Sequence, residues 1–283
     1  MNFADQLVKE IERKDSRVCV GLDPVFEKLP KQYSGADDPA EAAFDFNRKV
    51  IDAVKDYCVI VKPSLPFHLA LGEGGWVCFG KTIRYAKSKG LLTIADAKAN
   101  DLGNTAAAYA NAFYSDVGAD AITANVFMGS DSLKPFFDYC AKDKGIFVLV
   151  KTSNPSSSEF QDLKAENGKH FYEVFAKAVA NWGERFVGSE GFSSVGAVVG
   201  ATFPEQAKKI RRELKNCFFL VPGYGAQGGD ANGVKNCFNE EGLGAIVSAS
   251  RSVLYASGGK DFAQAAGSAA KKMQDEINAV LGL

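Results

Sequence analysis

The chain has 283 residues and a net charge of −1, because 33 basic residues nearly balance 34 acidic ones. That balance lacks the basic excess that DNA or an anionic membrane surface requires. No apolar run approaches the roughly 20 residues that span a bilayer, and the charged start, Met1–Asp15, lacks the apolar stretch of a secretory signal. We therefore expect a cytoplasmic protein that binds neither nucleic acid nor membrane.

Cysteine and histidine usage argues against disulfides and metal sites. The chain contains no CxxC motif and only two histidines, His68 and His170. Disulfides are rare in cytosolic proteins, and a tetrahedral zinc site needs closely spaced cysteine or histidine ligands. We expect structural cysteines and no metal. The cysteines are Cys19, Cys58, Cys78, Cys140, Cys217 and Cys237.

Short β-rich runs alternate with stretches of helical character along the whole chain. The runs are Val18–Leu22, Cys58–Lys62, Leu91–Lys98, Ala121–Val126, Ile146–Thr152, Val195–Ala201, Cys217–Val221 and Ala245–Ser250. Helical stretches include Ala40–Tyr57, Asn104–Val117, Lys169–Phe186, Pro204–Lys215 and Asp261–Leu281. Nearly continuous apolar runs are typical of parallel strands covered by helices on both sides. Eight such alternations predict a (β/α)8 barrel, the TIM barrel fold.

We expect this barrel to form a single domain over residues 1–283, with Met1–Lys14 as an added helix before the first strand. A doubly wound open sheet is the competing architecture, and periodicity alone does not separate the two. The least regular stretch, Ser153–Gly168, follows the fifth strand and is rich in serine. It is either a tolerated surface loop or a segment that covers a ligand at the mouth of the barrel.

Polar side chains interrupt the apolar strands where the strands end, which is where barrel enzymes place their chemistry. These residues are Asp23, Lys62, Asp96, Lys98, Asp101, Ser153 and Arg251. Asp96 and Lys98 are two residues apart on a strand, so their side chains leave the same face. Together with Lys62 and Asp101, they place two ammonium groups and two carboxylates in one cleft, unless they form ordinary strand-end ion pairs. Such an array stabilises a developing carbanion or repels a bound carboxylate.

A glycine-rich segment, VPGYGAQGGDANG, follows the seventh strand. Gly223, Gly225 and Gly228 match GxGxxG, but a dinucleotide site needs this motif at the first strand–helix turn. Glycine amides instead approach an anion closely, and Gln227 and Arg251 can donate hydrogen bonds to it. Barrels most often hold phosphate after strands seven and eight, so we predict a phosphorylated small-molecule ligand. The alternative is a flexible loop beside an unrelated arginine.

These features together resemble the orotidine 5′-phosphate decarboxylase family, in its longer bacterial-type branch. The resemblance covers almost the whole chain and rests on motifs in a fixed order: GLDP, VIVKPS, DAKANDLGNTAAAYA, ITAN followed by MG, VKTSNPSS, PGYGAQGGD and SASRS. The D-x-K-x-x-D core is shared with related phosphate-sugar decarboxylases. Lys62, TSNPSS and GAQGGD make the match specific.

The resemblance implies a homodimeric barrel that needs no cofactor or metal and converts orotidine 5′-phosphate to UMP and CO2. By analogy, Lys62, Asp96, Lys98 and Asp101 form a charged tetrad, with Lys98 donating the proton to C6. Asp101 and Thr105 act across the dimer. The substrate contacts implied for this chain are Asp23 and Lys62 for ribose, Ser153 for pyrimidine, and Gln227 and Arg251 for phosphate.

The chain departs from the family pattern at two places. Many relatives carry Arg-Gly where this chain has Ala99-Asn100, and some branches have glycine in place of Ser250. Neither change removes a charged group of the tetrad.

Two other functions stay open: a metal-dependent sugar-phosphate enzyme such as a keto-gulonate-phosphate decarboxylase or hexulose-phosphate synthase, and a non-catalytic phosphate binder. Lys62 disfavours the first, because a cation would meet a cation.

Overall fold

The computed structural model describes residues 1–225 and 228–283. Within these residues, eight parallel strands close into a barrel in chain order, and β1 pairs with both β2 and β8. The strands are β1 (Val18–Leu22), β2 (Ile60–Pro63), β3 (Leu92–Ala99), β4 (Ala121–Ala124), β5 (Gly145–Lys151), β6 (Ser193–Val199), β7 (Cys217–Pro222) and β8 (Ala245–Ala249). The predicted TIM barrel is confirmed, and the open sheet is excluded.

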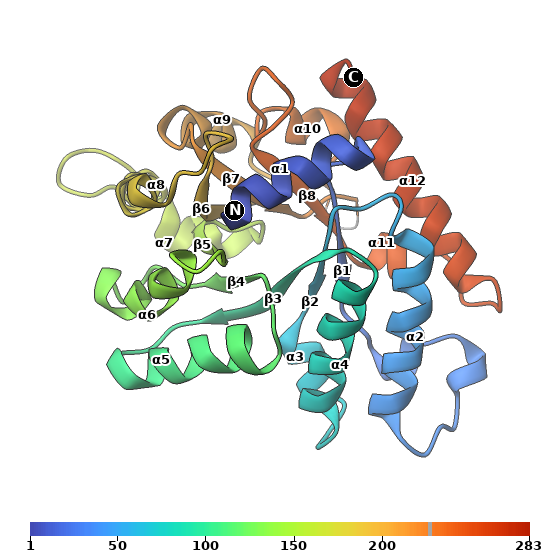
Figure 1. Ribbon diagram of the computed structural model, residues 1–283. Helices are drawn as coiled ribbons and strands as arrows, with labels where there is room; N and C mark the ends of the chain where they lie inside the picture. Colours follow the sequence, from blue (N-terminus) through green and yellow to red (C-terminus); the bar gives the residue numbers. More distant parts are fainter. Residues whose placement is uncertain (226–227) are drawn as a thin grey trace.

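Helices surround the barrel, as Figure 1 shows. They are α1 (Phe3–Lys14), α2 (Pro39–Val54), α3 (Leu65–Leu69), α4 (Gly75–Ser88), α5 (Gly103–Asn111), α6 (Ser130–Cys140), α7 (Ser158–Gln161), α8 (Phe171–Gly183), α9 (Pro204–Glu213), α10 (Ala231–Lys235), α11 (Arg251–Leu254) and α12 (Phe262–Leu281). Among the described residues, none of these helices has the length and apolarity to cross a membrane.

Local sequence signals explain where helices begin. The carboxylate of Asp38 accepts hydrogen bonds from the backbone N–H groups of Ala40 and Glu41, while Pro39 occupies the first position of α2. This cap satisfies N–H groups that the helix itself leaves without partners.

The predicted helix Asn104–Val117 is α-helical only to Asn111 and continues as a π-helical turn.

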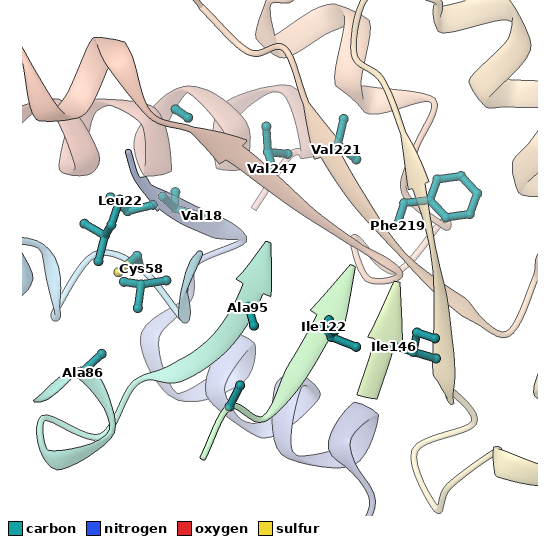
Figure 2. Close-up of a cluster of buried hydrophobic side chains, with 14 of the residues drawn as sticks. Val18, Leu22, Cys58, Ala86, Ala95, Ile122, Ile146, Phe219, Val221 and Val247 are labelled. Atoms are coloured by element: carbon teal, nitrogen blue, oxygen red, sulfur yellow. The ribbon is translucent and has the colours of Figure 1, made fainter. Parts of the chain in front are cut away.

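Two apolar layers lie on opposite sides of the barrel wall. On β1, Val18 and Leu22 face outward into the layer between strands and helices, part of which Figure 2 shows. Cys19 faces inward and belongs to the barrel interior. This alternation follows from the two-residue period of a strand. Further along each strand, every second residue again faces inward, closer to the carboxyl end of the barrel.

The added N-terminal helix closes the other end. Its apolar face, with Leu7 and Ile11 fully buried, packs on the interior cluster. The Phe3 ring lies edge-on to Phe147, with 6.0 Å between centroids. This approach requires glycine at 145, where a Cβ would lie only 2.2 Å from the Phe3 ring. Because α1 covers the amino ends of the strands, the carboxyl ends form the open mouth of the barrel.

Candidate active site

A cavity of about 470 Å³ lies at the carboxyl ends of the strands. Most of the predicted site residues line it: Asp23, Lys62, Asp96, Lys98, Ser153 and Arg251. They come from the ends of β1, β2, β3, β5 and β8, so the fold gathers residues separated by more than two hundred positions in sequence. This is the end of the barrel at which TIM-barrel enzymes bind their substrates.

Asp96 forms the centre of the charged group. Its Oδ2 accepts a hydrogen bond from Lys62 Nζ at 2.7 Å, and its Oδ1 accepts one from Lys98 Nζ at 2.6 Å. The Asp96 side chain is 9% exposed and that of Lys62 8%, whereas the Lys98 side chain is 53% exposed. Lys98 therefore presents a cation to the cavity, while the other two charges are held in the wall.

Burial and charge act in opposite directions on this group. Burial on its own would raise the pKa of Asp96, but Lys62 and Lys98 outweigh it and lower the pKa well below its usual value. For Lys62, burial would lower the pKa, but Asp96 and Asp23 outweigh it and raise the pKa. Both groups are consequently ionised at neutral pH, as a preorganised electrostatic site requires.

The backbone of β3 is distorted where it carries these charges. Ala95 pairs with Ile122 on β4, but Ala99 pairs with Ala124, so β3 has extra residues between the two pairs. Lys98 has a φ of 48°, in the left-handed region that residues other than glycine rarely adopt. Asp96 and Lys98 thus reach the same cavity through a bulge rather than along a regular strand. Strain of this kind concentrates at functional sites.

Thr123 on β4 holds this distorted segment and was not among the predicted site residues. Its hydroxyl donates to Asp96 Oδ1 at 2.8 Å and accepts from the Lys98 backbone N–H at 3.0 Å. The one signal for Thr123 in the sequence is that a polar residue stands near the end of an otherwise apolar strand. Its role becomes visible once β3 and β4 are paired.

Asp23 is the second carboxylate of the cavity. Among the described residues, its Oδ1 is buried without a hydrogen-bond partner. Buried polar atoms are nearly always paired, so this oxygen suits a donor supplied by a ligand. The hydroxyl of Tyr255 fixes the backbone here, donating to the Asp23 carbonyl at 3.1 Å and accepting from the Val25 N–H at 2.9 Å. Tyr255 was also not predicted.

Asp101 and Thr105 lie outside the cavity of their own chain. Asp101 Oδ1 accepts from the Leu102 backbone N–H at 2.7 Å, and Thr105 is exposed on α5. Within one chain, Asp101 therefore does not share the cavity with Lys62, Asp96 and Lys98. Asp23 supplies the second carboxylate instead.

The glycine-rich loop borders the same cavity through Gly223 and Tyr224, opposite Arg251 at the start of α11. The φ of Gly223 is 100°, and the Gly229 N–H donates to the Gly223 carbonyl at 3.1 Å. Gln227, predicted to bind phosphate, lies outside the described residues.

Glycine at 21 accommodates the departure from the family pattern at Ser250. A Cβ at position 21 would lie 1.9 Å from Ser250 Oγ. Glycine at 21 therefore leaves room for the side chain of Ser250, which directly precedes Arg251.

His68 lies in α3 and is fully buried behind the cavity wall. Its Nδ1 is 2.8 Å from the carbonyl of Ser64, a residue that lines the cavity. Burial lowers the pKa of His68 to about 4, so the ring is neutral at physiological pH. Among residues 1–225 and 228–283, no three His, Cys, Asp or Glu side chains converge as a metal-ion site would require.

An eight-stranded barrel with a buried carboxylate between two lysines at its mouth defines a class: a (β/α)8-barrel enzyme with a preorganised charged site. The orotidine 5′-phosphate decarboxylase / HUMPS family matches residues 16–266 of the chain. The chain belongs to this family, and like the relatives below it is an enzyme of the carboxy-lyase class.

Relatives match over nearly their whole length. Orotidine 5′-phosphate decarboxylase of Caldicellulosiruptor bescii is 40% identical, covering 99% of this chain and 99% of the relative. The enzyme of the same name from Rhodopirellula baltica is 41% identical, covering 94% and 92%. The solved structure of Leishmania donovani OMP decarboxylase superposes with a TM-score of 0.83 at 32% identity and covers 100% of both chains.

Proposed function

We propose that this chain decarboxylates orotidine 5′-phosphate to UMP and CO2, the last step of UMP synthesis, as one domain spanning residues 1–283 and without metal or cofactor. The observation that carries the proposal is Asp96 buried between Lys62 and Lys98 at the cavity, in a chain that matches decarboxylases end to end.

The substrate's parts fit different sides of the cavity. The proposed phosphate site is formed by Arg251 and Gln227 beside the glycine-rich loop, after strands seven and eight. Asp23 and Lys62 then meet the ribose hydroxyls, one of which donates to the Oδ1 of Asp23, an atom without a partner among the described residues. Ser153, across the cavity from β1, hydrogen-bonds the pyrimidine amide.

The chemistry follows from the fixed charges. When the bond from C6 to the carboxylate breaks, its electron pair stays on C6, a vinylic carbon that has no cofactor to accept it. The Lys98 ammonium stabilises that charge and transfers its proton to C6, while CO2 leaves. Asp96 repels the substrate carboxylate in the ground state, and binding of the distant phosphate offsets the cost of this repulsion. Solvent then reprotonates Lys98.

The proposed assembly is a cytoplasmic homodimer in which Asp101 and Thr105 complete the partner's site. Their position outside their own cavity supports this arrangement. Large apolar side chains are exposed nearby: Leu102 is 55% exposed and Phe127, after β4, is 85% exposed. A second copy of the chain would bury this surface.

The metal-dependent sugar-phosphate reaction is the alternative. It is disfavoured because the Lys62 ammonium already occupies the place beside Asp96, at 2.7 Å, where a cation would be needed. A non-catalytic binder is disfavoured because juxtaposed like charges bring no benefit to binding alone.

The test follows the ultraviolet absorbance of orotidine 5′-phosphate with purified protein, with and without EDTA. We expect rapid conversion to UMP at the same rate in both. Loss of activity with EDTA would favour the metal-dependent alternative. Absence of conversion by folded protein at high concentration, with tight nucleotide binding, would favour the binder.

A further inference from the structure

A buried lysine, Lys151, lies at the end of β5 but outside the cavity. Its side chain is 0% exposed, and its Nζ donates to Asp162 Oδ1 at 2.9 Å. The ammonium also lies 4.5 Å from the centroid of the Phe203 ring. Burying a lysine is costly unless it is paired, so this contact ties the loop carrying Asp162 to the last residue of the strand.

The neighbouring residue, Gln161, makes a second tie to the same strand end. Its side-chain Oε1 accepts from the Thr152 N–H at 2.9 Å, and its Nε2 donates to Thr152 Oγ1 at 3.0 Å. Thr152 Oγ1 in turn donates to Asn154 Oδ1 at 2.7 Å. One amide therefore fixes both the backbone and the hydroxyl of Thr152, the residue before Ser153.

Ser153 is also held from the β6 side. The Thr202 hydroxyl donates to the Ser153 carbonyl at 2.9 Å. A Cβ at Gly200 would lie 2.7 Å from the Ser153 Cα, so the two backbones are in direct contact. Thr152, Ser153 and Asn154 all line the cavity, and this segment forms its β5 wall.

The loop is anchored at its far end to α8. His170 Nδ1 lies 2.7 Å from the Asp162 carbonyl, which the tautomer protonated at Nδ1 satisfies. The His170 ring stacks on Tyr172 with centroids 5.3 Å apart, and Tyr172 is buried on α8. Asp162 is thus held at its carboxylate by Lys151 and at its carbonyl by His170.

We infer that Gln161 and Asp162 are positioning residues that set recognition of the substrate's base, by holding the Thr152–Asn154 wall against the cavity. Neither residue lines the cavity, so each acts through Thr152 or Lys151. The inference rests on the proposed function, because it takes Ser153 as the group that meets the pyrimidine. It predicts that loosening this wall weakens binding of the base and leaves binding of the ribose phosphate unchanged.

The experiment measures competitive inhibition by UMP and by ribose 5-phosphate, which lacks a base, with the intact enzyme. For Gln161→Ala we expect the inhibition constant of UMP and the KM to rise about tenfold, as loss of a hydrogen-bonded support implies. The inhibition constant of ribose 5-phosphate stays within about twofold, and so does kcat. Asp162→Asn keeps an acceptor for Lys151 and should show a smaller effect of the same kind.

Glu159→Ala is the matched control, because Glu159 is exposed on the same short helix α7. It should leave all these constants unchanged. Equal weakening of both inhibitors by Gln161→Ala, or of neither, in an enzyme whose wild type is active, would overturn the inference. An inactive wild type that does not bind UMP would instead overturn the proposed function.

Discussion

The two ends of the barrel both bury positive charge, but they satisfy it differently. At the closed end, the Arg211 guanidinium donates to the backbone carbonyls of Leu214 at 2.6 Å and Gly244 at 2.6 Å, and also to those of Cys217 and Cys237. At the mouth, Lys62 pairs with Asp96, and the nearby Asp23 retains a buried oxygen without a partner among the described residues. The Arg211 cation therefore holds backbone segments together, whereas the charged group at the mouth keeps an oxygen available for a ligand.

The two ends also differ in what borders the strands. At the mouth, Lys98 has a φ of 48° within a bulged strand. At the closed end, α1 covers the strand starts with a continuous apolar face. The difference indicates that mutations at the mouth should change catalysis with little loss of stability, and that mutations at the closed end should do the reverse.

The largest effect is expected for Lys98→Ala. Lys98 is the proposed proton donor, and the Lys62 ammonium is held in the cavity wall by Asp96, so kcat should fall by about 10³-fold or more. The side chain is 53% exposed, so the melting temperature should change little. Absorbance assays and thermal unfolding measure the two quantities, with Lys134→Ala on the exposed face of α6 as the control. Near-normal turnover in Lys98→Ala would refute the proton-donor role.

Arg211→Met should show the opposite pattern. It removes the guanidinium donor shared by the carbonyls of Leu214, Cys217, Cys237 and Gly244, which should lower the free energy of unfolding by about 3 kcal/mol or more. The kcat of the folded fraction should stay unchanged. Urea unfolding together with the absorbance assay tests this. A drop in kcat without loss of stability would remove the distinction between the two ends.

His68 should make stability depend on pH. Burial lowers its pKa to about 4, below the 6.5 of an exposed histidine. Between these values the unfolded chain binds the proton and the folded chain does not, so stability rises with pH and is lost on acidification.

From pH 6.5 to 4.5, this residue should cost the wild type about 2 kcal/mol of unfolding free energy, since each pKa unit corresponds to about 1.4 kcal/mol. His68→Gln, whose amide can still donate to the Ser64 carbonyl, should lack this component. Urea unfolding at both pH values measures it. Equal losses in the two proteins would show that His68 is not the group responsible.

The smallest effect is expected for Thr123→Val, which keeps the shape of the side chain but removes both hydrogen bonds to the β3 bulge. We expect kcat/KM to fall about tenfold, corresponding to about one hydrogen bond. Thr93→Val provides a comparison, because Thr93 lies on β3 and bonds Asp120 away from the cavity. Similar losses in both variants would assign the Thr123 effect to general stability.

The sequence predicted the barrel well because apolar strand runs and polar strand ends are local patterns. The strands lie within two residues of their predicted bounds, and Asp96 and Lys98 reach the same cavity. Residue spacing alone did not show that Asp23, and not Asp101, is the second carboxylate lining the cavity of one chain, because this depends on how β1 and β3 are brought together. Thr123, Tyr255 and Gln161 were missed because their contacts exist only after distant segments are packed together.

Asp96→Asn, measured in two ways, tests most directly whether charge at the mouth is arranged for reaction rather than for binding. We expect kcat to fall by about 10³-fold, while orotidine 5′-phosphate binds at least as tightly as to the wild type. Binding is kept because the repulsion between two carboxylates is removed. Weaker binding of the substrate with kcat preserved would contradict it.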